Sequence, residues 1–362
     1  MAEDCKNQPI WALGLMSGTS LDGVDAALLR TDGTRILEFG ESLTHAYSDA
    51  DRAQLFDCIS GKGDIPTATQ MLTERHIEAV ESLLAQSSIP RAEIKLIGFH
   101  GQTILHAPER GITQQIGDAA LLAERTRIPV IADFRSRDVA AGGQGAPLVP
   151  LYHAALAANL PHPVVIVNIG GVANITYIDG DTIIACDTGP GNAPIDDWVR
   201  RHTGIPYDVD GKIAAAIAPN EAVIAQLLAH PFFAAPPPKS LDRNGLARFI
   251  APHIEPLELG EGASTLTEFT AASIAAIAKH LPATPKQWLI TGGGRRNPTL
   301  LNSLNKHLAN IVVVEGAGWH GDALEAQAFA FLAVRSLNAM PLSLPTTTGV
   351  PEPTTGGIYY GI

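Results

Sequence analysis

Residues 11–30 read WALGLMSGTSLDGVDAALLR, and this stretch decides the fold. Its first seven residues are mostly apolar, which is typical of a buried strand. A turn rich in glycine, hydroxyl and aspartate residues follows, and DAALLR (25–30) predicts a second strand. The stretch therefore predicts two strands joined by a turn of small and polar residues.

The same pattern returns about halfway along the chain. VVIVNIGG (164–171) is an apolar run ending in glycines, and VANITYI (172–178) predicts another strand. IIACD (183–187) then leads into the glycine turn TGPGN (188–192). Two similar α/β domains would leave a duplication of this kind in the sequence. Chance similarity between short apolar strands is the alternative.

Helical and strand patterns alternate over the rest of the chain. Apolar residues at helical spacing predict helices over 68–87 and 118–127, and apolar runs predict strands over 129–134 and over 95–99, the latter ending at His100. Further alternating elements are predicted over 265–281, 288–294, 298–309, 311–316 and 322–338. Repeated alternation favours the α/β class with substantial parallel sheet.

Length and composition exclude several classes of protein. A chain of 362 residues exceeds the size at which a single core keeps growing, so two domains are expected. The net charge is −12, and nucleic-acid-binding proteins usually carry a basic surface, so nucleic-acid binding is not expected. No apolar run reaches the about 18 residues of a membrane helix, and no signal peptide is visible. The three cysteines have no CxxC spacing, which favours a reducing compartment. We expect a soluble cytoplasmic protein without nucleic-acid or membrane partners.

Common catalytic motifs are missing from the sequence. It contains no GxxxxGK[ST] phosphate loop, no HExxH zinc motif and no GxSxG nucleophile elbow. The segment GPGNAP (189–194) lacks the third glycine of a dinucleotide fingerprint, which argues against an oxidoreductase.

Four glycine-rich turns remain, each at the end of an apolar strand. The first, 17–25, offers amides and hydroxyls to an anion, with Asp22 and Asp25 as candidate magnesium ligands. The second, 168–174, offers amides and two asparagines, and the fourth, 291–297, suits the adenosine or α-phosphate of a nucleotide. Ordinary hairpin and strand-to-helix turns are the alternatives. The candidate nucleotide-binding residues are Gly18, Thr19, Ser20, Leu21, Asp22, Gly23, Val24, Asp25, Asn168, Gly170, Gly171, Gly292, Gly293, Gly294 and Asn297.

The third turn, 186–192, places Asp187 where an apolar strand meets glycines. A carboxylate at such a position is poorly solvated on one side and open on the other, which suits a general base or a metal-linked role. An aspartate that only caps the turn is the alternative.

Two similar hairpin turns and a later strand–GGG–helix turn form a layout that resembles the actin/Hsp70/sugar-kinase superfamily. Within it, a series of motifs resembles the family of anhydro-N-acetylmuramic acid kinases, in the family's order and over nearly the whole chain. These motifs lie at 14–28 (GLMSGTSLDGVDAAL), 98–108, 115–150, 168–178, 186–192, 236–244, 289–301 and 318–333 (GWHGDALEAQAFAFLA).

The resemblance implies an α/β protein with a two-domain actin-like ATPase fold. Its domains would be duplicated and ribonuclease H-like, with an interdomain cleft. We expect the first domain over 1–140, with the tail 345–362 returning to it, and the second over 141–344. A homodimer is also implied.

The family's members use ATP and Mg²⁺ to phosphorylate 1,6-anhydro-N-acetylmuramic acid and open its ring with water. The product, N-acetylmuramic acid 6-phosphate, enters peptidoglycan recycling. By motif, Asp187 would be the base that activates the water. Glu325 lies on one helical face with Asp322 and would orient water or substrate. A solvated helix face is the alternative for Glu325.

The segment 134–145 is the predicted sugar site. Arg135 or Arg137 would pair the lactyl carboxylate in bidentate fashion, and Asp138 would accept from a hydroxyl. Alternatively, an arginine pairs with Asp133 or Asp138. The candidate substrate-binding residues are His100, Gln102, Thr103, Arg135, Asp138, Gly143, Gln144 and Gly145, with Lys239 and Arg243 as weaker candidates.

Three rival functions stay open at this point. They are a kinase for another sugar or an acidic relative, a phosphohydrolase of the same superfamily, and a non-catalytic sugar-sensing protein. The non-catalytic protein would be expected to have lost Asp187, Asp22 or Asp25, and all three are present.

Overall fold

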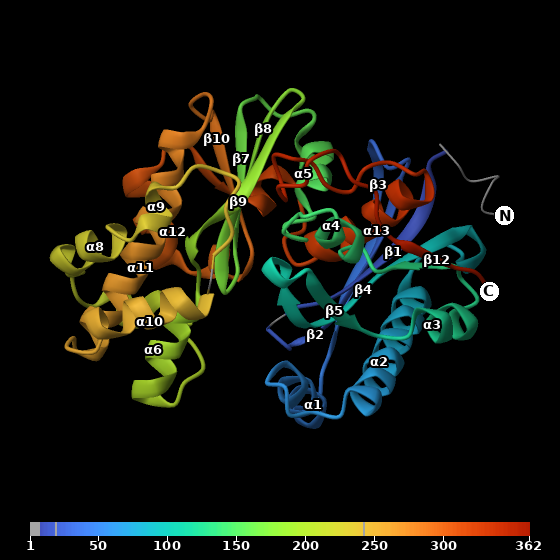
Figure 1. The fold of residues 1–362 in the computed structure, drawn as a ribbon, viewed down its shortest axis with the longest axis horizontal. Coiled ribbons are helices and arrows are strands. Elements are labelled where there is room, and N and C mark those ends of the chain that lie inside the picture. Colours follow the sequence, from blue (N-terminus) through green and yellow to red (C-terminus); the bar gives the residue numbers. More distant parts are fainter. Residues whose placement is uncertain (1–7, 19, 242) are drawn as a thin grey trace. The chain divides into compact units, whose positions relative to one another are not determined.

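The computed structural model describes residues 8–18, 20–241 and 243–362, which divide into two compact units (Figure 1). Unit 1 consists of the described residues up to Ala158 and of Asp322–Ile362, and unit 2 is Asn159–Gly321. The division differs from the predicted boundaries, because 141–158 and 322–344 group with unit 1.

Unit 1 is built on one mixed sheet with the strand order β12-β6-β4-β1-β2-β3, to which β5 is added at β4. β1, β2 and β3 are antiparallel to one another in turn, whereas β4 is parallel to β1 and β6 is parallel to β4. Its strands are β1 Ile10–Ser17, β2 Gly23–Thr31, β3 Ile36–Ala46, β4 Ile94–Ala107, β5 Ile112–Ile116, β6 Val130–Ala132 and β12 Ile358–Tyr360. Its α-helices are α1 Asp49–Ile59, α2 Ile65–Gln86, α3 Ala119–Thr126, α4 Ser136–Ala140, α5 Pro150–Ala157 and α13 Leu324–Leu337.

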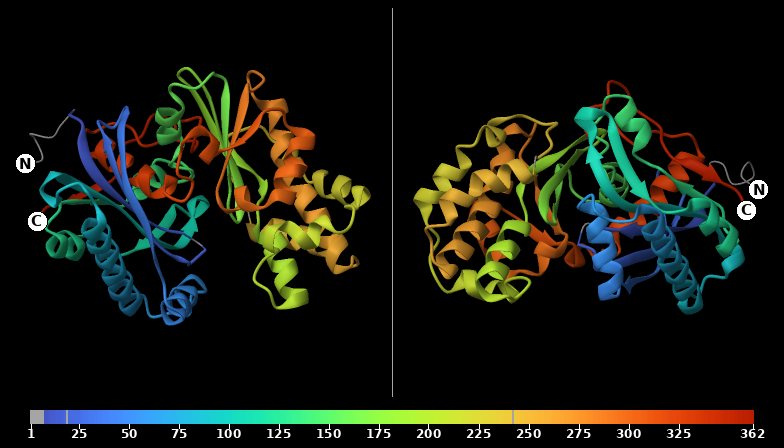
Figure 2. Two further views of the ribbon diagram at one scale, coloured as in Figure 1. Left: turned by 180° about the vertical axis from the view of Figure 1, so that it is seen from behind. Right: turned by 60° about the horizontal axis from the view of Figure 1, so that its bottom comes forward.

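The two faces of this sheet carry different helices, as the views of Figure 2 show. Leu13 and Leu15 point into a core shared with α1, α2 and α3. Because side chains alternate along a strand, Gly14 faces the other way, toward α13. Gly98 pairs with Gly14 across β1 and β4, and both lie against the backbone of α13. The sequence analysis placed this segment in the second domain. The close approach of α13 to β1 and β4 explains why it belongs to unit 1 instead.

Unit 2 repeats the strand order of unit 1. Its sheet runs β11-β10-β7-β8-β9, with β7, β8 and β9 antiparallel in turn and with β10 parallel to β7 and to β11. Matching β7 to β1 and β10 to β4 gives the same central order in both units, that of a ribonuclease H-like domain. The predicted α/β fold with two actin-like halves is thus confirmed, and chance similarity between the strands does not account for it.

The elements of unit 2 include a group of helices that the sequence patterns did not predict. Its strands are β7 Val164–Ile169, β8 Val172–Asp179, β9 Thr182–Pro190, β10 Gln287–Thr291 and β11 Ile311–Val313. Its α-helices are α6 Ala193–Thr203, α7 Lys212–Ala215, α8 Glu221–Leu228, α9 Pro231–Ala234, α10 Arg243–Ile254, α11 Leu259–Ala275 and α12 Pro298–His307. Helices α11 and α12 cover one face of the sheet, and α6, α8 and α10 form a separate core with α11. No helix of the described residues is long and apolar enough to cross a membrane.

The prediction that a strand ends at His100 is wrong. β4 continues to Ala107, because Gly101 takes a left-handed φ of 70° and the outer part of the strand pairs with β5. His100, Gln102 and Thr103 therefore lie inside a long strand and not in a turn after it.

Candidate functional site

The first glycine turn joins β1 to β2 in unit 1. Leu21 has a left-handed backbone (φ 55°), and its N–H donates to the carbonyl of Gly18 over 3.3 Å. The Ser20 hydroxyl donates to Oδ1 of Asp22 over 2.7 Å. Thr19, which was also predicted to bind nucleotide, lies outside the described residues.

Two of the predicted turn residues already belong to β2. Gly23 and Val24 are buried and pair with Ala46 and His45 of β3. They hold the base of the turn in the sheet, so the backbone offered to a ligand is that of the residues before them.

Asp25 on β2 lies close to other negative charges. Burial raises the pKa of its carboxyl to about 7, and the charges of Asp22, Glu325 and Asp322 raise this pKa as well. A 2.5 Å hydrogen bond from the Thr44 hydroxyl acts in the opposite direction. A bound cation would relieve this repulsion. The described residues contain no group of three or more metal-ligating side chains. Mg²⁺ commonly takes only one or two carboxylates, however, so Asp22 and Asp25 fit it.

Arg135 is held in place by His100. The guanidinium donates from Nε and Nη2 to Nε2 of His100, over 3.1 and 2.9 Å, and from Nη1 to the carbonyl of Gly145 over 2.6 Å. Nδ1 of His100 lies 2.7 Å from the carbonyl of Gly101. Burial and the charge of Arg135 lower the pKa of His100 well below its ordinary value, so the imidazole is neutral. Burial lowers the pKa of Arg135 to about 10, which still leaves it charged at neutral pH.

Glu325 lies in the first turn of α13 and is exposed to solvent. Its charge raises the pKa of both Asp25 and Arg135, which places it within electrostatic reach of the acidic turn and of the arginine. Its position explains how a residue so late in the sequence comes to the first turn, because α13 packs directly on β1 and β4.

Asp138 fixes the glycine loop of the predicted sugar site. Its Oδ1 accepts from the N–H of Gly145 over 2.6 Å, and its Oδ2 accepts from the hydroxyl of Thr348 over 2.6 Å. An added Cβ at Gly143 would lie 2.3 Å from Oδ1 of Asp138. Gln144 donates through its N–H to the carbonyl of Thr348 over 2.7 Å. Asp138 is therefore engaged within the protein, and its direct role is to hold the loop.

The predicted pairing of an arginine with Asp133 or Asp138 is not what the structure has. Arg135 binds His100 and Gly145, and Arg137 donates to the hydroxyl of Thr355 over 2.7 Å. The Asp133 carboxylate accepts from the N–H of Ser136 over 3.2 Å.

Gln102 and Thr103 differ in exposure. Gln102 is fully buried; its Oε1 accepts from the Ser17 hydroxyl over 2.6 Å, and its Nε2 donates to the carbonyl of Thr103 over 3.2 Å. Thr103 is half-buried, and its hydroxyl accepts from Nε2 of Gln115 over 3.2 Å. A buried and engaged amide does not suit direct substrate contact, so we assign Gln102 a supporting role.

In unit 2, Asp187 is a largely buried carboxylate whose pKa is shifted by its surroundings. Burial raises its pKa to about 6, against the effects of a backbone hydrogen bond and of the Lys239 charge. The hydrogen bond comes from the N–H of Leu241 to Oδ2 over 2.8 Å, and the Asp187 N–H donates to the carbonyl of Lys239 over 3.0 Å. The loop before α10 therefore fixes Asp187 through its backbone. Lys239 itself donates from Nζ to the carbonyl of Phe232 over 2.9 Å.

The three glycine turns of unit 2 lie side by side. The N–H of Asn192 donates to the carbonyl of Gly170 over 2.7 Å, and the N–H of Gly191 donates to that of Gly171 over 3.0 Å. An added Cβ at Gly292, whose φ is 75°, would lie 2.4 Å from Oδ1 of Asn168. An added Cβ at Gly191 would lie 2.1 Å from the carbonyl oxygen of Gly170, so at Gly191 and Gly292 the close packing requires glycine.

The fourth turn continues from Gly292 into α12. Gly293 and Gly294 form a short 3-10 turn that packs near Asn192. Asn297 is the N-cap of α12, and its Oδ1 accepts from the N–H groups of Thr299 and Leu300 over 3.0 and 3.1 Å. Its side chain thus completes the helix.

Sequence patterns missed two features beside these turns. One is the Lys239–Leu241 backbone that holds Asp187, which no local motif could reveal because it lies more than 50 residues further along the chain. The other is a mainly apolar pocket between α6 and α10. It borders the turns at Gly171 and Pro190 and includes Trp198 and Leu241 in its lining.

Comparison with known proteins agrees with this layout. A family model described as "Anhydro-N-acetylmuramic acid kinase" matches residues 10–361. The anhydro-N-acetylmuramic acid kinase of Rhodopseudomonas palustris (strain BisB18) is 52% identical over 361 residues, which is 96% of this chain and 98% of the relative. That of Acidiphilium cryptum (strain JF-5) is 53% identical over 356 residues, which is 96% of this chain and 97% of the relative.

Proposed function

This chain belongs to the anhydro-N-acetylmuramic acid kinase family, and we propose that it phosphorylates 1,6-anhydro-N-acetylmuramic acid with ATP while water opens the anhydro ring. The products are N-acetylmuramic acid 6-phosphate and ADP, and the reaction serves peptidoglycan recycling. In this substrate O6 is bonded to C1 and is not a free hydroxyl. Water must therefore add at C1 as O6 leaves and takes the γ-phosphoryl group.

The environment of Asp187 is the observation that carries the proposal. A pKa of about 6 leaves the carboxylate ionised at neutral pH yet more basic than an ordinary aspartate. The Leu241 N–H holds Oδ2, which leaves Oδ1 as the atom that takes a proton from the attacking water. An inert turn cap would not need a loop from the middle of the unit to orient it.

Arg135 supports recognition of the acidic sugar. The substrate carries a lactyl carboxylate, and a planar guanidinium pairs such a group more specifically than an ammonium does. The neutral His100 ring and the Gly145 carbonyl fix the orientation of the guanidinium before any ligand arrives. Asp138 keeps the loop at Gly143–Gly145 closed beside it.

Each unit has glycine turns of a kind that suits part of a nucleotide. Backbone amides at the first turn and at Gly171 suit phosphate oxygens, whereas the N–H of Gly170 donates to the carbonyl of Val172 over 3.2 Å. The turn at Gly292–Gly294 suits the nucleoside side of ATP. Asp22 and Asp25 would hold Mg²⁺, with Glu325 close enough to affect the same charges. When bound, the ion would neutralise charge that develops on the transferring phosphoryl group.

The test is an ATP-dependent assay with purified 1,6-anhydro-N-acetylmuramic acid, with the product identified by mass spectrometry. We expect a product heavier than the substrate by one HPO₃ and one water. A product that gains HPO₃ alone would indicate an ordinary sugar kinase, and ATP hydrolysis without any sugar product would indicate a phosphohydrolase. Either result would overturn the proposal.

Two further expectations belong to the same proposal. The resemblance implies a homodimer, which light scattering of the purified protein would establish or exclude. A cytoplasmic location fits a pathway that uses ATP, and fractionation of expressing cells would check it.

A further inference from the structure

We propose that Tyr47 is a positioning residue for the first glycine turn, which it holds at both ends through Ser17 and Asp22. The inference rests on the proposed function in one respect, namely that this turn binds the phosphates of ATP. No sequence motif points to Tyr47, because it lies at the end of β3, more than 20 residues after the turn.

Tyr47 contacts both ends of the turn. Its hydroxyl lies 2.7 Å from Oγ of Ser17, the last residue of β1, and its N–H donates to the carbonyl of Asp22 over 3.0 Å. Ser17 in turn bonds to Gln102 over 2.6 Å. Tyr47, Ser17 and Gln102 are all buried, so bulk water does not replace these bonds. We call them the Tyr47–Ser17–Gln102 chain.

The direction of each hydrogen bond in this chain follows from its far end. The carbonyl of Thr103 can only accept, so the Gln102 atom beside it is the NH₂ group. The atom facing Ser17 is then the amide oxygen, to which the Ser17 hydroxyl donates its only proton. Ser17 must therefore accept from Tyr47, and the phenol is the donor. A buried chain with a single direction of donation has one low-energy arrangement, which favours one position of the Ser17 side chain.

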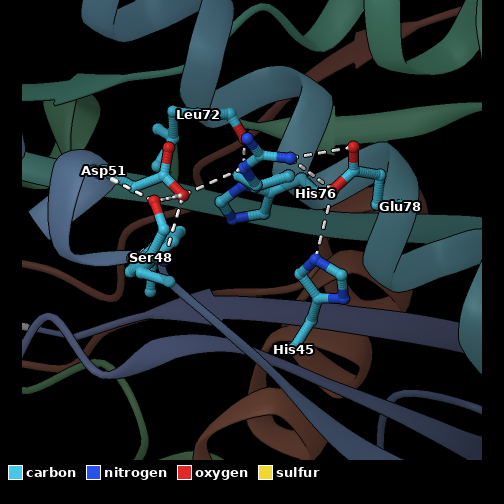
Figure 3. A network of polar contacts seen from close by, with 9 residues as sticks. His45, Ser48, Asp51, Leu72, His76 and Glu78 are labelled. Carbon is cyan, nitrogen blue, oxygen red and sulfur yellow. Dashed lines mark hydrogen bonds and ion pairs between the residues drawn. The ribbon is translucent and has the colours of Figure 1, made fainter.

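A second network fixes the residues on either side of Tyr47 (Figure 3). Ser48 caps α1 by exchanging hydrogen bonds with Asp51, whose Oδ2 also accepts from Nε of Arg75 over 3.1 Å. Arg75 pairs with Glu78, and Oε2 of Glu78 lies 3.1 Å from Nε2 of His45. The polypeptide is thus held two residues before Tyr47, at His45, and directly after it, at Ser48.

This arrangement gives the turn a rigid base. The described turn residues between Ser17 and Gly23 make one backbone bond within the turn, Leu21 to Gly18, of 3.3 Å. Backbone amides that bind a phosphate need a fixed position. Tyr47 fixes the turn through its hydrogen bonds to Ser17 and Asp22. Loss of its hydroxyl would leave the Ser17 hydroxyl without its donor and loosen the side-chain anchor next to Gly18, while the backbone of Ser17 stays paired with Gln102 of β4.

Tyr47→Phe tests the proposal, because it removes one oxygen and keeps the buried ring. Tyr152→Phe is the matched control in the same unit: Tyr152 is also fully buried, and its hydroxyl donates to Oε1 of Gln327 over 2.7 Å. Tyr47→Phe loses the buried hydrogen bond to Ser17, and Tyr152→Phe loses the buried hydrogen bond to Gln327. Both bonds are 2.7 Å long. For each protein we would measure KM for ATP, KM for the anhydro sugar, kcat and the thermal midpoint, together with calorimetric binding of a non-hydrolysable ATP analogue.

We expect Tyr47→Phe to raise KM for ATP and to lower the binding affinity for the ATP analogue, each by about tenfold or more. KM for the sugar should change by less than about twofold. Both variants should lower the thermal midpoint by similar amounts, because each loses one buried hydrogen bond. Tyr152→Phe should leave KM for ATP unchanged. Unchanged analogue binding in Tyr47→Phe would overturn the proposal, as would equal losses in both variants. If wild type binds the analogue but does not convert the sugar, the proposed function fails while the analogue measurements still decide the role of Tyr47. If wild type binds no analogue, both fail.

Discussion

Arg135 donates two hydrogen bonds to a single atom, Nε2 of His100, from Nε over 3.1 Å and from Nη2 over 2.9 Å. Arginine has no acceptor, so this ring nitrogen must carry a lone pair and the imidazole must be neutral. A buried neutral histidine thereby orients a cation without adding a second charge. The arginine keeps its full charge for an anionic ligand.

Arg135→Lys should raise KM for the anhydro sugar by about 10- to 100-fold, because lysine retains the charge but not the planar fork that binds a carboxylate. KM for ATP should change little. Arg137→Lys is the matched control, since Arg137 is exposed and bonds to Thr355. If steady-state kinetics show the larger effect for Arg137→Lys, the carboxylate is bound by Arg137 and our assignment is wrong.

Asp187→Asn should lower kcat by at least about 100-fold, because the amide cannot take the proton from water. In wild type, kcat should fall as the pH drops below about 6, since a base acts in its deprotonated form and burial raises the pKa of Asp187 to about 6. Asp196→Asn is the control, because the pKa of Asp196 is also raised, to about 7, in the same unit. An acid limb that disappears in Asp196→Asn but stays in a partly active Asp187 variant would contradict the assignment.

Gly14→Ala should destabilise the protein by about 3 kcal/mol or more, because the new Cβ would lie 1.7 Å from the carbonyl oxygen of Ala326 in α13. Gly98→Ala should be destabilising to a similar extent, because its new Cβ would lie 2.1 Å from the carbonyl oxygen of Phe329. At Gly61 an added methyl meets nothing within 4 Å, so only its left-handed φ of 73° opposes alanine and the cost should be about 1 kcal/mol. Denaturant unfolding would measure all three, and equal losses would show that α13 does not pack on these glycines as described.

His76→Leu should make the protein more resistant to acid. Burial lowers the pKa of His76 to about 4, so the native state binds fewer protons than the unfolded state between about pH 6.5 and 4. Native stability therefore falls in wild type as the pH drops through this window, by up to about 3 kcal/mol for a group of this kind. Leucine removes that loss, and it also removes Nε2, which has no hydrogen-bond partner in the described structure.

Thermal midpoints of wild type and His76→Leu, taken from pH 7.5 to pH 4.5, provide the check. The difference between the two proteins should shift in favour of the variant as the pH falls. Parallel curves would mean that His76 takes up no proton on unfolding in this range. The comparison between the two proteins removes the opposite contribution of carboxyls with raised pKa, such as Asp25.

Local sequence was sufficient for the strands of the two repeated hairpins, for the glycine turns and for the position of Asp187 in one of them. Apolar runs of strand length and glycine-rich turns act over a few residues, so the hairpin at 11–30 and its repeat at 164–192 could be predicted without any distant contact. The same motifs were specific enough to indicate the family, which the comparisons confirm over residues 10–361. Helices α6, α8 and α10 were missed; their apolar residues form a core with α11, a partner far from α6 in the sequence.

Only the tertiary structure decided what each polar side chain does. Gln102 and Asp138 belong to motifs that indicated substrate contact, yet both are engaged within the protein by Ser17 and by Gly145. Tyr47 belongs to no motif, yet it forms hydrogen bonds with Ser17 and Asp22 at the two ends of the first turn. These outcomes depend on partners far apart in the sequence, and a buried polar atom is satisfied by whichever group the packing brings to it. Residue type and spacing therefore determined where chemistry could occur, whereas long-range packing determined which residues are left to perform it.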